Sequence, residues 1–195
     1  MDADDIHRVL KRDDLCGPIF VGVFPRDALV RAIKDLLFGR KTFVAVFNSH
    51  AIDQPGEHWM AIYAEGRKAY YFDSYGGHPD IYPDVYEALR DNFDSVKWNE
   101  NVLQGITTTA CGDYCVLFCL LMSRAWTFDE IIERFEEYPN AERRDHAVRA
   151  TLIALYGSDA YASIRNKRRG LSGVHSLHVD TALDSIVDRL FASAM

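Results

Sequence analysis

The chain lacks a hydrophobic run long enough to cross a membrane. A transmembrane helix needs about 18 or more consecutive apolar residues, and no segment of the 195 residues reaches that length. The first five residues, Met-Asp-Ala-Asp-Asp, also offer neither the basic region nor the apolar region of a secretory signal peptide. We therefore expect an intracellular protein that is neither secreted nor bound to a membrane.

Cysteine is scarce, with 4 residues at positions 16, 111, 115 and 119. The last three recur at intervals of four, which would place them on one face of a helix and does not suit a disulfide framework. The paired C-x2-C spacing of a typical zinc site is absent, so we expect no metal and no cofactor. Burial as small apolar side chains is the simplest interpretation of Cys115 and Cys119.

Basic residues are outnumbered, with 22 Lys and Arg against 29 Asp and Glu, a net charge of −7 and a pI near 5.4. This balance disfavours nucleic acid as the main partner. One local basic cluster remains, formed by Arg165, Lys167, Arg168 and Arg169. It is either a solvated loop or a contact for phosphate or a partner, which leaves nucleic-acid binding as a weak alternative.

No internal repeat and no low-complexity linker divides the chain. Its composition is 48% hydrophobic and 12% aromatic, which is enough to build a core and argues against disorder. We expect a single domain over residues 1–195. The elements that carry the candidate chemistry fall within residues 43–125, and a helical C-terminal part covers residues 127–195.

Hydrophobic periodicity and capping residues predict a mixture of helices and strands. Strands are expected at residues 19–24, 42–47, 58–64, 68–73 and 95–98. Helices are expected at residues 5–11, 25–37, 84–93 and 111–126, from residue 127 onward, and at 140–157 and 180–191. The predicted class is α+β: a small, mostly antiparallel sheet with helices packed around it and a central helix that begins at Cys111.

Cys111 is the first residue of the most continuously apolar of these helices. The backbone N–H groups and the dipole at a helix N-terminus stabilise a thiolate, and Gly112 behind it permits a close approach of backbone. A buried structural cysteine fits the same pattern when Cys111 is considered alone.

His58 starts one predicted strand and Asp73 ends the next. If the two strands pair as a hairpin, both side chains lie at its open end, where the carboxylate can accept a hydrogen bond from Nδ1 of the imidazole. That contact would fix the tautomer of the base. Taken singly, His58 also fits an ordinary half-buried histidine, and Asp73 fits a residue that ends a strand.

Gln104 precedes Cys111 by seven residues. Its amide could donate a hydrogen bond to a developing oxyanion beside the N–H of Cys111, although a lone glutamine there would be an exposed loop residue. The order His, Asp, Gln and Cys-Gly is far more specific than any single member. Together the four residues offer the nucleophile, base, orienting acid and oxyanion donor of a thiol acyl-transfer site.

These motifs resemble the adenain family, the maturation proteases of adenoviruses. The resemblance covers about residues 14–125, and the wider group includes SUMO-specific proteases of the Ulp type. It rests on Leu15-Cys16-Gly17-Pro18-x-Phe20-x-Gly22, His58-Trp59-Met60-Ala61, Tyr71-Phe72-Asp73-Ser74-Tyr75-Gly76 and Gln104-Gly105 followed by Ala110-Cys111-Gly112-x-x-Cys115.

The resemblance implies a cysteine endopeptidase that cleaves protein substrates after small residues at glycine-rich sites. It makes Cys111 the nucleophile, His58 the general base and Asp73 its orienting partner, and it makes Gln104 the oxyanion donor. Trp59 would flank the substrate cleft beside Gly112. We expect maturation of capsid precursor proteins of a virus or of a Polinton-type mobile element, in the host nucleus or cytoplasm and in the virion.

The chain also departs from the adenain pattern. Adenain is activated by a peptide that forms a disulfide with a cysteine between the acidic residue and the glutamine, and here no cysteine lies between Ser74 and Ala110. We therefore expect no disulfide-linked activating peptide. Two alternatives stay open: a protease that deconjugates a ubiquitin-like modifier, as in the Ulp branch, and a non-catalytic binding module with the same fold.

Overall fold

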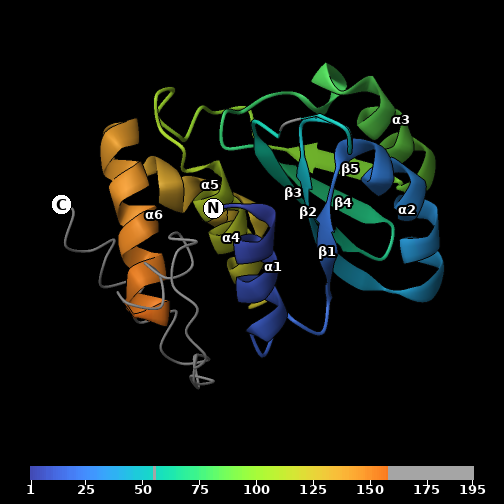
Figure 1. The fold of residues 1–195 in the computed structure, drawn as a ribbon, viewed down its shortest axis with the longest axis horizontal. Helices are drawn as coiled ribbons and strands as arrows, with labels where there is room; N and C mark the ends of the chain where they lie inside the picture. Colours follow the sequence, from blue (N-terminus) through green and yellow to red (C-terminus); the bar gives the residue numbers. More distant parts are fainter. Residues whose placement is uncertain (55, 158–195) are drawn as a thin grey trace.

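The computed structural model describes residues 1–54 and 56–157 (Figure 1). The predicted helix at 180–191 and the basic cluster at 165–169 lie outside the described residues. Within them, none of the helices is long and apolar enough to cross a membrane.

A mixed five-stranded sheet forms the centre of the fold, with strand order β1-β2-β3-β4-β5. The inner pairings β2–β3 and β3–β4 are antiparallel, and the outer pairings β1–β2 and β4–β5 are parallel. The α+β class is therefore confirmed, with parallel pairing at both edges. The strands are β1 (Phe20–Phe24), β2 (Thr42–Asn48), β3 (Trp59–Glu65), β4 (Lys68–Phe72) and β5 (Ser95–Trp98).

Helices cover both faces of the sheet (Figure 1). One face packs against α2 (Arg26–Gly39) and α3 (Pro83–Asn92). The other carries α1 (Ala3–Arg12), α4 (Cys111–Met122), α5 (Phe128–Glu136) and α6 (Ala141–Tyr156). A single 3-10 turn, η1 (Pro79–Ile81), precedes α3.

Strand β2 shows how the sequence divides between the two layers. Phe43, Ala45 and Phe47 face the cluster under α2 and α3, whereas Val44 and Val46 face the cluster under α4. Alternate side chains of a strand point to opposite faces. Because β2 is covered on both faces, nearly all its side chains are apolar, which is the continuous apolar run that predicted this strand.

The predicted hairpin joins β3 and β4 through Gly66 and Arg67. Glu65 pairs with Lys68, and Gly66 adopts a positive φ of 57° that suits glycine in a tight turn. At the opposite end of the hairpin Ala61 pairs with Phe72, so His58 and Asp73 lie just beyond the last register pair. The hairpin thus brings these two residues together from positions 15 apart in the sequence.

Helix α4 lies in the core, and all its side chains are buried. Complete burial explains its continuous apolar character. The prediction that this helix extends to residue 126 is wrong, because α4 ends at Met122. Ala125 has a positive φ of 63°, and the N–H of Trp126 donates to the carbonyl of Leu121, which closes the helix in the manner of a Schellman turn.

Candidate active site

His58 and Asp73 form a close pair at the open end of the hairpin. Nε2 of His58 lies 2.7 Å from Oδ1 of Asp73, and both side chains are largely buried. The pairing was predicted, but through Nδ1 of the ring, and that detail is wrong. With Nε2 engaged by the carboxylate, Nδ1 is the ring nitrogen left for the hydrogen bond with the thiol of Cys111.

Backbone contacts hold the Asp73 carboxylate in place. Its Oδ1 also accepts a hydrogen bond of 2.8 Å from the N–H of Tyr75, a local turn typical of aspartate. The side chain of Asn99 bonds to both the N–H and the carbonyl of Asp73, at 3.0 and 2.6 Å. A Cβ at Gly77 would lie 2.6 Å from Oδ2 of Asp73, so the turn needs glycine at that position.

Cys111 is the first residue of α4 and is 8% exposed. The preceding residue, Ala110, provides no side-chain cap for the helix. The first N–H groups of a helix have no partner within it. Here they remain available to a negative charge on or beside the sulfur of Cys111, where the dipole of α4 also favours that charge.

The thiol of Cys111 and the imidazole of His58 alter each other's proton affinity. Burial alone would raise the pKa of Cys111, but the hydrogen bond with His58 and the backbone N–H groups of Trp59 and Gly112 outweigh it and lower that pKa. Burial alone would lower the pKa of His58, but Asp73 and the thiol outweigh it and raise that pKa to about 9. The pair therefore favours thiolate and imidazolium near neutral pH.

The other cysteines have the opposite character. Burial raises the pKa of Cys16 to about 12 and holds the pKa values of Cys115 and Cys119 well above the usual range. All three side chains are fully buried. Cys111 is therefore the one thiol of the chain suited to react as a thiolate.

Gln104 lies in the same region but is 1% exposed and fully engaged. Its Oε1 accepts a hydrogen bond of 2.8 Å from the hydroxyl of Ser74. Its Nε2 donates to the carbonyl of Thr108 at 2.8 Å and to the hydroxyl of Tyr75 at 3.1 Å. The oxyanion-donor role of Gln104 stays a prediction, and both hydrogens of its amide already have acceptors inside the protein.

Trp59 and Gly112 lie against the start of the chain. The indole N–H of Trp59 donates to the carbonyl of Met1 at 3.1 Å. A Cβ at Gly112 would lie 3.1 Å from Cβ of Met1 and 3.4 Å from Cδ1 of Ile6. The missing side chain of Gly112 thus lets residues 1–6 approach α4 directly behind the thiol, and substrate contact by these two residues stays a prediction.

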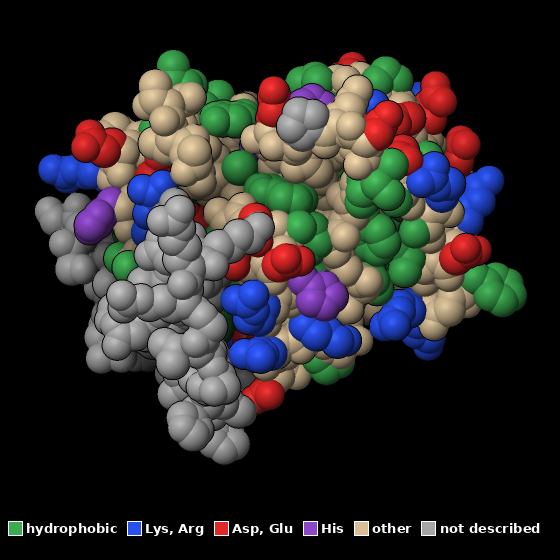
Figure 2. Space-filling model, in the orientation of Figure 1, with side chains coloured by type: hydrophobic (Ala, Val, Ile, Leu, Met, Phe, Trp, Pro, Cys, Tyr) green, Lys and Arg blue, Asp and Glu red, His purple; other side chains and the backbone are tan. Residues whose placement is uncertain are grey.

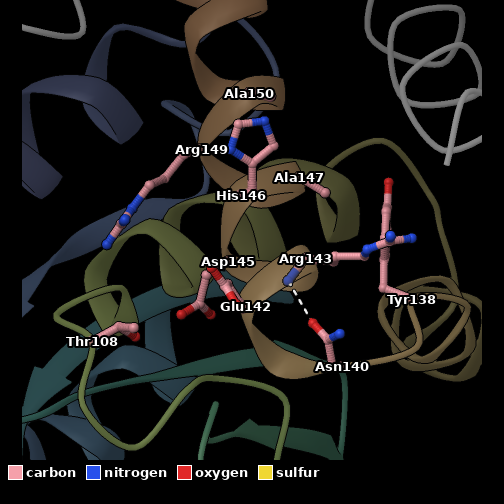
Figure 3. A pocket seen from close by; sticks show the side chains of 10 residues that line it. All are labelled: Thr108, Tyr138, Asn140, Glu142, Arg143, Asp145, His146, Ala147, Arg149 and Ala150. Atoms are coloured by element: carbon pink, nitrogen blue, oxygen red, sulfur yellow. Dashed lines mark hydrogen bonds between the residues drawn. The ribbon is translucent and has the colours of Figure 1, made fainter.

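A cavity of about 870 Å³ lies beside α6, next to the loop that carries Gln104 (Figure 3). Thr108 and Asp145 line part of it. The carboxylate of Asp145 accepts hydrogen bonds from the N–H of Gly105 and from the buried hydroxyl of Tyr114. Asp145 therefore ties the Gln104 loop to α4 and α6. No cluster of three or more potential metal ligands occurs in the part of the chain that the structure describes.

Comparison with known proteins gives this site a context. No protein-family model matches the chain. It is 27% identical over 125 residues to "Protease" of human adenovirus B serotype 3, over 57% of this chain and 57% of that protein. It is also 30% identical over 104 residues to "Putative thiol protease R355" of Acanthamoeba polyphaga mimivirus, over 48% of this chain and 34% of that protein. The chain is thus similar in sequence to adenovirus proteases. The match spans little more than half the length of the adenovirus B protein.

Among solved structures, the fold of this chain is similar to that of ChlaDub1 from Chlamydia trachomatis. The TM-score is 0.56 at 14% identity, covering 85% of this chain and 92% of that one. At this level of identity the similarity concerns the fold alone. It agrees with a fold in which helices cover both faces of a mixed sheet.

Ser74, Tyr75 and Asn99 are parts of the site that sequence reasoning missed. Ser74 and Tyr75 follow Asp73 directly and belong to the same sequence motif, so that motif could have indicated their place in the site. Asn99 follows β5 at a distance of 26 residues from Asp73, and only the parallel pairing of β4 with β5 brings it there. No local pattern indicates that contact.

Replacement of Asp73 by asparagine should weaken the thiolate–imidazolium pair while keeping a hydrogen-bond acceptor at Nε2. The carboxylate raises the pKa of His58, so its loss lowers that pKa from about 9. A weaker imidazolium stabilises the thiolate less, so the pKa of Cys111 rises. In Asp73→Asn the midpoint of Cys111 alkylation against pH should therefore move to higher pH, as measured by mass spectrometry.

Asp129→Asn is the matched control. Asp129 is an exposed carboxylate that pairs with Lys97 on the surface, and its loss should leave the alkylation profile of Cys111 unchanged. An unshifted profile in folded Asp73→Asn would contradict the proposed coupling between the carboxylate, the imidazole and the thiol.

Proposed function

We propose that this protein is a cysteine endopeptidase, with Cys111 as nucleophile, His58 as general base and acid, and Asp73 as the group that orients the imidazole. One observation carries the proposal. A thiol of lowered pKa at the start of α4 lies against an imidazole whose far nitrogen is held 2.7 Å from a buried carboxylate. This geometry serves nucleophilic catalysis and has no evident structural purpose in a core that could hold apolar side chains there.

The first half of the reaction forms a thioester. The thiolate of Cys111 attacks the carbonyl carbon of the scissile bond, and the π electrons of the carbonyl move onto its oxygen. The N–H of Cys111, at the start of a helix without a side-chain cap, would donate a hydrogen bond to that oxyanion. Collapse restores the carbonyl and breaks the C–N bond, while Nδ1 of the imidazolium gives its proton to the leaving amine.

The second half releases the acyl product. Neutral His58 accepts a proton from water at Nδ1, and the resulting hydroxide attacks the thioester carbon. The C–S bond breaks, the product leaves as a carboxylic acid that ionises, and Cys111 returns as a thiolate beside imidazolium. Asp73 stabilises the charged ring in both halves and is not itself protonated.

Protein chains with glycine at the cleaved bond are the substrates that fit this site. The sulfur lies below the surface, because Cys111 is only 8% exposed and Trp59 contacts it through its backbone N–H. A bulky residue beside the scissile carbonyl would clash on the way to such a buried nucleophile, whereas glycine would not. From the resemblance to the maturation proteases of adenoviruses, we propose structural precursor proteins of a virus or virus-like element as the natural substrates.

We propose that activation of this protein involves no disulfide with an activating peptide. Three of the four cysteines are fully buried, so a covalent activator could reach only Cys111 itself and would block it. Figure 2 shows a local group of basic side chains beside a histidine in the lower middle of the face, with acidic side chains around it. The net charge of −7 disfavours DNA as a requirement for activity. We therefore propose activity without a disulfide-linked peptide and without DNA.

Purified protein should cleave a peptide that contains a Gly-Gly bond in an extended segment, in reducing buffer and without DNA. The same peptide with leucine in place of the first glycine should be cleaved at least about 10-fold more slowly, because the larger side chain clashes at a buried thiol. Chromatography with mass spectrometry of the products identifies the bond. Added DNA should leave the rate unchanged across a salt series.

Two outcomes would contradict parts of this proposal. Equal cleavage of the glycine and leucine peptides would remove the glycine preference. A large stimulation by DNA that fades steeply with salt would show that phosphate contacts activate the protein. Charge reversal at Lys167, Arg168 and Arg169 would then test whether the basic cluster makes those contacts.

A further inference from the structure

Asp145 is a buried carboxylate that contacts the loop carrying Gln104. It lies on α6, beyond the motifs that resemble the adenain family, and is 3% exposed. The N–H of Gly105 donates to both of its oxygens at 3.4 Å, and the hydroxyl of Tyr114 donates to Oδ1 at 3.0 Å. Burying a carboxylate costs free energy unless donors contact it. Here these donors belong to the loop of Gln104 and to α4.

Gly105 is the residue through which this contact reaches Gln104. Its carbonyl accepts hydrogen bonds from the N–H and from the hydroxyl of Thr108, each at 3.0 Å. The carbonyl of Thr108 in turn accepts from Nε2 of Gln104 at 2.8 Å. A Cβ at Gly105 would lie 3.2 Å from Oδ2 of Asp145, so the close approach needs glycine. A shift of Gly105 would therefore move the acceptor that orients the amide of Gln104.

Other contacts hold the start of the same loop. The guanidinium of Arg144 on α6 donates to the carbonyl of Val102 at 3.1 Å. The N–H of Gln104 donates to the carbonyl of Ser74 at 3.0 Å. These two contacts fix the loop up to Gln104, and Asp145 fixes the residue that follows.

We propose that Asp145 is a positioning residue of the active site, which holds this loop so that the amide of Gln104 can donate to the oxyanion. The inference rests on the peptidase function proposed above and on the donor role that the resemblance gives to Gln104. A charged oxygen is a stronger acceptor than the hydroxyl of Tyr75 and takes the amide hydrogen from it in the transition state. The other amide hydrogen stays on Thr108, so the donor is preorganised and no proton is transferred.

Asp145→Ala removes both acceptor oxygens and leaves the thiol and its imidazole in place. Turnover of the Gly-Gly peptide should fall about 10- to 10²-fold, because a misplaced oxyanion donor loses most of its effect. KM should change by less than about twofold, since ground-state binding is untouched. Asp145→Asn should restore most of the loss, because its amide can accept from Gly105 and donate to the oxygen of Tyr114. Wild-type turnover in folded Asp145→Ala would overturn the inference.

A peptide aldehyde separates positioning from a general disturbance of the site. Its adduct with the thiol carries an oxygen where the oxyanion forms. Asp145→Ala should weaken aldehyde binding by about the factor that it takes from kcat, and should leave binding of the matching peptide alcohol unchanged. The pH midpoint of Cys111 alkylation by iodoacetamide should stay at the wild-type value, because this small reagent needs no oxyanion donor. Unchanged aldehyde affinity, or a shifted midpoint, would overturn the inference.

A double-mutant cycle tests whether Asp145 acts through Gln104. Once Gln104→Ala has removed the donor, adding Asp145→Ala should lower turnover by less than about twofold further. Losses that multiply in the double variant would show that Asp145 acts by another route, which would contradict the proposed role.

Glu142→Ala is the matched control. Glu142 is an exposed carboxylate in the first turn of α6 and lines the same cavity as Asp145 (Figure 3), and its loss should leave turnover and aldehyde binding as in wild type. Asp145→Leu, which keeps a buried side chain but offers no acceptor, replaces Asp145→Ala if that variant does not fold. Failure of the peptidase proposal would appear separately, as cleavage that survives Cys111→Ala.

Discussion

Cys111→Ala abolishes cleavage of the Gly-Gly peptide, with a fall of about 10⁴-fold or more, as expected when a covalent nucleophile is lost. The chain should stay folded, because the change removes one sulfur atom at the first residue of α4 and leaves the rest of the helix intact. Steady-state kinetics measure the loss, and thermal unfolding followed by circular dichroism measures the fold.

Cys119→Ala is the matched control for that experiment. Cys119 lies two turns further along α4, is fully buried and has a pKa well above the usual range. Per folded molecule, Cys119→Ala should retain wild-type activity even where its melting temperature falls. If folded Cys111→Ala still cleaved the peptide at the wild-type rate, the assignment of the nucleophile would be wrong.

His58→Ala should lower kcat about 10²- to 10⁴-fold, the range that general acid–base catalysis supplies. It also removes the hydrogen bond that lowers the pKa of Cys111, so alkylation of this thiol near neutral pH should slow. Added imidazole should restore part of the activity by occupying the space left by the ring.

His7→Ala is the control for the loss of a histidine. His7 is exposed on α1 and contacts Phe20 edge-on, away from the hydrogen bonds of the site. Its removal should leave kcat and the alkylation rate unchanged. A rate of alkylation in His58→Ala equal to that of wild type would show that the imidazole does not activate the thiol.

Elements with strong local signals could be predicted from the sequence. The hairpin of β3 and β4 was readable because a glycine separates two apolar runs, and α5 because Thr127 and Glu130 form a capping box. The strand pairings at the two edges of the sheet could not be predicted from the sequence. Pairing of β1 with β2 and of β4 with β5 is parallel and depends on helices that cross between strands, so contacts far apart in sequence decide it.

The site shows the same division between local and tertiary information. The hairpin brings His58 to Asp73, so their pairing followed from the strand ends alone. The choice of Nε2 over Nδ1 depends on the rotation of the imidazole between Asp73 and the thiol, and no sequence pattern encodes it. The engagement of Gln104 by Ser74 and Tyr75 likewise depends on how the loop folds back over the turn after β4.

Active-site labelling tests the central claim most directly. Wild-type protein is incubated with a Gly-containing peptide that ends in a thiol-reactive vinyl sulfone, and the adduct is located by proteolysis and mass spectrometry. Our account predicts one adduct per chain, on Cys111, formed more slowly in His58→Ala and absent in Cys111→Ala. An adduct on Cys16, Cys115 or Cys119, or cleavage of the matched peptide without any adduct, would contradict it.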